Sequence, residues 1–369
     1  GIAKALVGLS CVHLRQGSES GAGDKVRIRL EEMLPSLESG SIAGKVLLHL
    51  AESAKRNGQM QQAQEYLERS MEHYKNSSDR PGLSDSKIAL AAVLTMPAED
   101  APKRIKRAER LLKESLEIKR TIGDRHGVAE VFRYLGGIAQ TQDDLEAGEN
   151  YLRQSLKMHE ALGAIFNMGA ACNSLAICKM YMGDYEIADA LLEDAIRCFD
   201  RIGDQLAVSH VMLNKGTLAI NRLQLKQAQL LLDETRELKE KLGSTWGLYD
   251  LYNHLALLAM WRGEFEQAEK LLTATLEDLN ESETDEDKTI ARSLLGLLRC
   301  FQGRLQLAAL ELGRARGDAE EMGDTKISAL CQANASLYAL LTEAKTVYSE
   351  LLTRVHLVGA GFEIAARPD

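Results

Sequence analysis

Small residues recur along this chain at a fixed spacing of 40 positions. The first such column consists of Gly148, Ala188, Ala228, Ala268 and Ala308. A leucine column keeps the same step at Leu152, Leu192, Leu232, Leu272 and Leu312, and a glycine column keeps it at Gly123, Gly163, Gly203, Gly243 and Gly323. Three columns with one period predict a repeat protein, in which each unit packs mainly against its neighbours.

Each 40-residue unit has the pattern of a helical hairpin. A first helix with a small residue such as Ala176 or Gly216 leads to a turn glycine such as Gly183, and a second helix ends at the next column glycine. Glycine can adopt the left-handed conformation that ends a helix. With only 5 prolines and 5% aromatic residues, the chain favours helix over sheet. We therefore predict an all-α fold, a right-handed α–α superhelix of eight to nine hairpins.

The small columns are expected where two helix backbones approach most closely. A leucine in place of Ala228 would overpack such a contact and cost about 1–3 kcal/mol. Together these columns resemble the tetratricopeptide repeat, in a form longer than 34 residues that lacks the closing proline. This long form is similar to the sensor regions of bacterial signal-transduction ATPases and transcription activators, including the maltose-activator type, and to peptide-sensing regulators of Gram-positive bacteria.

The repeat frame also predicts how the chain is divided. Residues 44–356 should form the solenoid of eight hairpins, residues 1–43 an eroded N-terminal hairpin, and residues 357–369 a tail or the start of a further domain. A 45-residue step from Ala63 to Ala108 predicts a longer elbow around residues 96–102. Neither end has a convincing polar cap, so we expect fused or docked neighbouring domains, or alternatively a tail that packs over the last hairpin.

The resemblance places the first helix of each hairpin on the concave face and thereby names candidate groove residues. These are Arg133, Asn173, Tyr181, His210, Asn214, Asp250, Asn253 and Trp261. An asparagine amide both donates and accepts, which matches the backbone of an extended peptide, and peptide-binding relatives are expected to use groove asparagines in this way. Two alternatives remain open: the asparagines are ordinary polar residues without a ligand, and the stripe of Met260, Trp261 and Phe301 is core packing.

Other functional classes lack support in the sequence. A net charge of -9 disfavours direct contact with nucleic acid, and no apolar run reaches the ~20 residues of a membrane span. Six cysteines without a CxxC pair predict free thiols in a reducing, cytoplasmic compartment. No phosphate loop, HExxH, GxSxG or close Cys/His set occurs, so we expect no cofactor, no metal and no catalytic activity.

These observations predict a non-catalytic scaffold that holds a protein or peptide segment in its groove, as the sensing part of a larger cytoplasmic regulator. The alternative is a sensor domain that binds a small-molecule effector and signals to a fused ATPase or DNA-binding domain. A peptide would run along several hairpins, whereas a metabolite needs a closed pocket between few of them.

Overall fold

The computed structural model describes residues 22–37, 40–56, 59–95, 101–243, 247–278, 285–322 and 327–343, and contains no strand in these ranges. The helices are α2 (Ala22–Met33), the 3-10 helix η1 (Leu34–Ser36), α3 (Ser41–Arg56), α4 (Met60–Asn76), α5 (Arg80–Leu94), α6 (Ala101–Thr121), α7 (Arg125–Thr141), α8 (Leu145–Leu162), α9 (Ile165–Met182), α10 (Tyr185–Ile202), α11 (Gln205–Asn221), α12 (Leu225–Leu242), α13 (Leu248–Trp261), α14 (Phe265–Asp278), α15 (Asp285–Phe301) and α16 (Leu305–Met322). Residues 327–343 are also helical.

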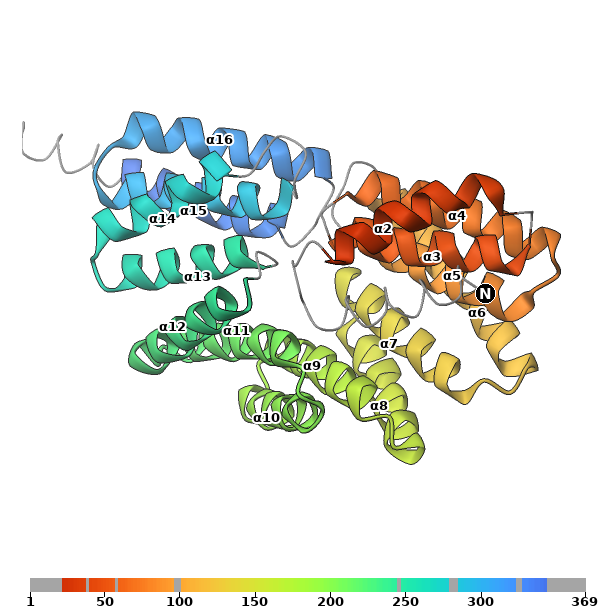
Figure 1. Ribbon diagram of the computed structural model, residues 1–369. Coiled ribbons are helices and arrows are strands. Elements are labelled where there is room, and N and C mark those ends of the chain that lie inside the picture. Colours follow the sequence, from red (N-terminus) through yellow and green to blue (C-terminus); the bar gives the residue numbers. More distant parts are fainter. Residues whose placement is uncertain are drawn as a thin grey trace, which may run out of the picture.

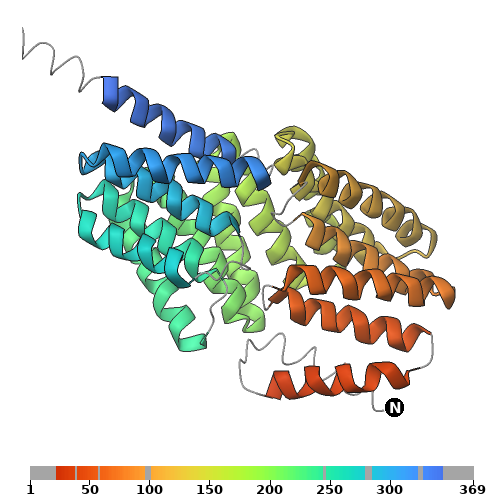
Figure 2. The same cartoon turned by 90° about the horizontal axis from the view of Figure 1, so that it is seen from above.

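From α3 onward the helices pair into hairpins, α3 with α4 through α15 with α16, and the hairpins stack in sequence order. The stack curves, so that the hairpins of α3–α6 and of α13–α16 stand on opposite sides of the molecule (Figures 1 and 2). Successive first helices pack directly on one another, for example α5 on α7 and α13 on α15. The predicted all-α superhelix is confirmed, with the first helices toward the inside of the curve.

Two predicted divisions fall largely outside the described residues. Helix α3 begins close to the predicted start of the solenoid at residue 44, and α2 is the described part of the predicted N-terminal hairpin. The tail at 357–369, the last part of the predicted solenoid from residue 344 to 356 and most of the elbow at 96–102 lie outside the described residues. The helix ends at that elbow, Leu94 and Ala101, lie farther apart in sequence than the helix ends at the turns inside the other described hairpins.

Local sequence explains where the helices begin and end. Asp124 and Asp204 precede α7 and α11, and their side chains accept hydrogen bonds from the backbone N–H groups of Gly127 and Ala207 at 2.8 and 3.0 Å. Such caps satisfy N–H groups that the first helical turn leaves unpaired. The column glycines end α8, α10 and α12 in the left-handed conformation, with φ of 62°, 70° and 61°. The predicted helix-ending column is therefore confirmed at these three sites.

The small columns lie at the closest helix contacts. Ala188, Ala228, Ala268 and Ala308 are each fully buried, as are Leu192, Leu232 and Leu272. A Cβ atom built on Gly216 of α11 would lie only 2.6 Å from a methyl carbon of Leu232 on α12. A side chain at that position would therefore displace the leucine, which is why the column holds only small residues.

The turn between the two helices of a hairpin supplies a test of backbone strain. Gly183 and Gly263 hold this turn with φ of 81° and 76°, whereas Leu223 takes the same place with φ 58° and is 67% exposed. A leucine in the left-handed region costs roughly 1–2 kcal/mol, and little packing offsets that cost here. We expect Leu223→Gly to raise the free energy of unfolding by about 1 kcal/mol in urea denaturation. A decrease would show that Leu223 makes contacts worth more than the strain.

Candidate functional site

Two predicted groove residues join adjacent first helices. The Nδ2 of Asn214 on α11 donates a hydrogen bond of 2.9 Å to Oδ1 of Asn173 on α9, and both side chains are half-buried. This bond leaves one N–H of Asn214 and the amide nitrogen of Asn173 for a ligand. The two asparagines therefore serve the helix packing and still present polar atoms at the inner face.

The third asparagine has a different environment. Asn253 on α13 is only 3% exposed, and its Nδ2 donates to the backbone carbonyl of Asp287 on α15 at 3.1 Å. Its Oδ1 is buried and accepts no hydrogen bond within the described residues. The side chain is therefore committed to the contact between α13 and α15 and does not line an open groove.

Arg133 on α7 is bound to its own helix. Its guanidinium donates to both carboxylate oxygens of Glu130, at 2.6 and 3.3 Å, and lies 4.2 Å from the ring centre of Tyr134. Burial opposes the charge of both groups, but their mutual attraction prevails, so that the pKa of Glu130 is lowered and that of Arg133 is raised. The pair is thus fully ionised at neutral pH.

The predicted stripe of large groove residues divides into two kinds. Met260 is 6% exposed and belongs to the core, whereas Tyr181 and Trp261 are 53% and 59% exposed at the ends of α9 and α13. Phe301 on α15 is 48% exposed and stacks on Phe265 of α14. Core packing therefore explains the methionine but not the exposed area of the aromatic rings.

His210 and Asp250 belong to a charged cluster at the inner face, together with Lys239, His254 and Asp287. Nδ1 of His254 lies 3.0 Å from a carboxylate oxygen of Asp250, one turn away on α13. Burial and the Lys239 ammonium lower the pKa of His210 to about 4. Burial and the Asp250 carboxylate raise the pKa of Asp287 to about 7. The cluster therefore joins α11, α12, α13 and α15 electrostatically.

The raised pKa of Asp287 predicts a pH-dependent stability. A carboxyl that holds its proton more tightly in the folded state stabilises that state below pH ~4, and this contribution is lost as the pH rises toward 7. Asp287→Asn should therefore raise the free energy of unfolding at pH 8 by about 1–2 kcal/mol. This figure is smaller than the pKa shift alone would give, because solvent contact weakens the effect. The advantage should vanish at pH 4. Urea denaturation at both values is the measurement, and an equal gain at both would exclude the titration of this carboxyl as the cause.

The sequence analysis did not identify one further column of buried residues with the same 40-residue spacing. They are Lys119, His159, Phe199 and Lys239, each four positions before a helix-ending glycine and each at most 4% exposed. Lys119 on α6 contacts Asp85 on α5 and Gly127 on α7, and so lies between two successive first helices. The 40-residue spacing could have identified the column, but its chemistry changes from unit to unit, which hides it from a search for similar residues.

A second feature without a sequence signal is a cavity of about 420 Å³, which we call the N-terminal cavity. Helices α3, α5 and α7 form its walls, and Lys119, Asp124 and Asn167 complete them. None of the predicted groove residues lines this cavity. Arg133 pairs with Glu130, which does line it. The predicted residues are thus spread over the inner face instead of meeting in one pocket.

Two lysines of the first helices, Lys179 and Lys215, form ion pairs within the protein. Lys179 pairs with Glu149 and Asp184, and Lys215 pairs with Glu193 and Asp189, so both ammonium groups are held within the protein. The described cysteines, which are all six except Cys11, form no disulfide with one another. Among the described residues, no group of His, Cys, Asp and Glu side chains could hold a metal ion.

No protein-family model and no curated protein matches the sequence. Solved structures do match: a Rap protein complexed with Competence and Sporulation Factor gives a TM-score of 0.61 at 12% identity, covering 92% of this chain and 98% of that chain. NprR in complex with its cognate peptide NprX gives 0.54 at 13% identity, covering 90% and 98%, and the apo quorum sensor NprR from B. thuringiensis gives 0.53 at 14%, covering 92% and 98%.

The chain has the tetratricopeptide-like fold. Its structure is similar to those of the Rap protein and NprR over nearly their full length, and at these identities the similarity establishes the fold alone. Within the described part of this tetratricopeptide-like solenoid, no helix is both long and apolar enough to cross a membrane.

Proposed function

We propose that the chain is a binding scaffold without catalytic activity, which holds an extended peptide or protein segment along its inner face as the sensing part of a larger cytoplasmic regulator. The observation that carries this proposal is the Asn173–Asn214 pair, which presents amide groups on adjacent first helices. An extended peptide needs such donors and acceptors at successive positions. The exposed rings of Tyr181 and Trp261, on the same set of helices, supply apolar surface for its side chains.

The fold comparison supports a peptide rather than another kind of partner. NprR binds its cognate peptide NprX, and this chain covers 98% of that structure with the same fold. A small-molecule effector is the alternative, and it would occupy one enclosed pocket instead of several hairpins. The two proposals differ in how many first helices the ligand contacts.

Selection of peptides from a random display library on the full chain would test the proposal. We expect peptides whose affinity falls on the order of tenfold in Asn173→Ala/Asn214→Ala, because each lost amide hydrogen bond is worth about 0.5–1.5 kcal/mol. The matched control is Asn150→Ala/Gln154→Ala, which removes a second bonded amide pair, with a distance of 3.0 Å, from the exposed face of α8. Failure to select any peptide, or equal loss in both variants, would contradict the proposal.

A further inference from the structure

The N-terminal cavity has an apolar floor and a charged rim. Its floor is formed by Leu48 of α3 and by Ile88, Ala89 and Ala92 of α5, where the alanines leave space that larger residues would fill. A volume of about 420 Å³ is in the range of ligand pockets and exceeds the packing voids of a protein interior. The floor suits the methylene groups of an aliphatic chain.

The rim carries an excess of negative charge. Four carboxylates line the cavity, Glu52, Asp85, Asp124 and Glu130, against the ammonium groups of Lys55 and Lys119. The Arg133 guanidinium pairs with Glu130 from outside the lining, which leaves a formal charge of -1 with histidine neutral. The cavity is open to solvent, so water partly screens this charge from a bound ligand. The excess favours a cationic ligand and disfavours an anionic one.

The two lysines do not reverse this preference, because both are paired. The side chain of Lys119 is 5% exposed, and its Nζ lies 2.5 Å from Oδ1 of Asp85 and 2.7 Å from Oδ2 of Asp124. Lys55 pairs with Glu52 at 2.7 Å. The Asp85 carboxyl is half exposed and uses one oxygen for Lys119, so its second oxygen can accept a hydrogen bond from a ligand.

An unsatisfied histidine packs against His126, one of the residues that line the cavity. His159 is fully buried, and neither ring nitrogen has a hydrogen-bond partner in the described part of the chain. Its ring centre lies 5.5 Å from that of His126, which lines the cavity. Burial lowers the pKa of His159, so its neutral ring keeps one nitrogen as an acceptor. His159 itself does not line the cavity, so it makes no contact with a ligand there.

We propose that the N-terminal cavity binds the side chain of a lysine or arginine residue of the partner peptide. The aliphatic stem lies on Leu48, Ile88, Ala89 and Ala92, and the charged head meets the carboxylates of Glu52 and Asp85. This inference rests on the proposed function, because the residue belongs to the peptide that the inner face holds. It adds a subsite at α3–α7, away from the asparagine pair on α9 and α11.

The test is a methyl NMR titration of the full chain labelled at alanine, isoleucine and leucine methyl groups. The probes are Nα-acetyl-lysine amide, Nα-acetyl-arginine amide and the neutral Nα-acetyl-norleucine amide, which has a similar stem without the charge. We expect the cationic probes to shift the methyl signals of Leu48, Ile88, Ala89 and Ala92, and the neutral probe to bind at least tenfold more weakly. Equal binding of all three, or shifts confined to other methyl groups, would overturn the proposal.

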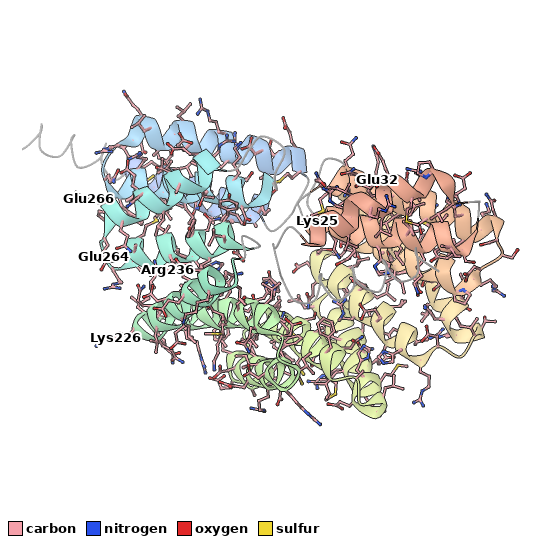
Figure 3. All side chains as sticks on the ribbon, in the orientation of Figure 1. Lys25, Glu32, Lys226, Arg236, Glu264 and Glu266 are labelled. Carbon is pink, nitrogen blue, oxygen red and sulfur yellow. The ribbon has the colours of Figure 1, made fainter. Side chains whose placement is uncertain are left out.

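Variants distinguish a loss of binding caused by the removed charges from one caused by misfolding. Glu52→Gln/Asp85→Asn should weaken the cationic probes on the order of tenfold, whereas Glu266→Gln should not, because Glu266 lies at the outer edge on α14 (Figure 3). Should the double variant fail to fold, Ala89→Leu fills the cavity and keeps every charge, and it should abolish the shifts. Spermidine is a further probe. If it binds more than tenfold tighter than both cationic amino acid amides, the ligand is a free polyamine and not a peptide side chain, and the proposal is overturned.

The library selection distinguishes this inference from the proposed function. Peptides selected without any requirement for lysine or arginine would refute the cavity assignment and leave the scaffold function intact. No selected peptides at all would refute the scaffold function, whatever the methyl signals show.

Discussion

Leu232→Ala is expected to lower the free energy of unfolding by about 2–5 kcal/mol, the usual cost of removing a buried leucine side chain. Leu232 is fully buried on α12, and its methyl carbon lies next to Gly216 of α11. Gly216→Ala should cost about 1–3 kcal/mol, because the added Cβ would lie 2.6 Å from that methyl carbon. Combined, the two changes should cost less than their sum, since the shortened side chain leaves room for the new methyl group.

Urea denaturation of the two single variants and the double variant measures this coupling. We expect a coupling free energy of roughly 1–2 kcal/mol in favour of the double variant, as is usual for residues in contact. Gly137→Ala is the control, because a Cβ there meets no atom within 4 Å. Additive costs would show that α11 and α12 do not approach as closely as the structure has them.

Lys119→Met is expected to lower stability and to strengthen the binding of cations in the N-terminal cavity. The methionine replaces the stem of a side chain that is 5% exposed, but it releases the carboxylates of Asp85 and Asp124 from their shared ammonium. Breaking a buried ion pair costs about 3–5 kcal/mol. We expect about 2–3 kcal/mol, because the Asp85 carboxyl is half exposed and regains water.

The same change makes the rim of the cavity more negative by one charge. Binding of Nα-acetyl-lysine amide should therefore tighten, by roughly three- to tenfold at low salt, and the gain should shrink at high salt. Methyl NMR titration and urea denaturation of one sample measure both effects. Lys226→Met on the outer edge is the control for the loss of a positive charge (Figure 3). Weaker binding in Lys119→Met would mean that the ammonium itself holds the ligand.

The repeat fold could be predicted from the sequence because the same residue types recur at positions 40 apart. Ala188, Ala228 and Gly216 occupy positions where only a small residue permits close helix contact, and the glycines at 163, 203 and 243 end helices at equal intervals. These requirements are local and repeat in every unit, so the same residue pattern can be observed several times in one sequence. Hairpins and turns could be predicted from them, whereas the inner position of the first helices was predicted from the resemblance to the tetratricopeptide repeat.

The side-chain contacts at the inner face could not be predicted from the sequence. They join residues some 40 positions apart, and whether these residues meet depends on the rotation between successive hairpins. Asn173 and Asn214 meet across α9 and α11, whereas Asn253 is buried against α15, although the sequence treats Asn173 and Asn253 as equivalent. The sequence by itself determined the repeat and its helical hairpins. The tertiary structure alone decided which groove residues are free to bind, since the curvature of the stack sets both the pairing of Lys119 and the cavity beside it.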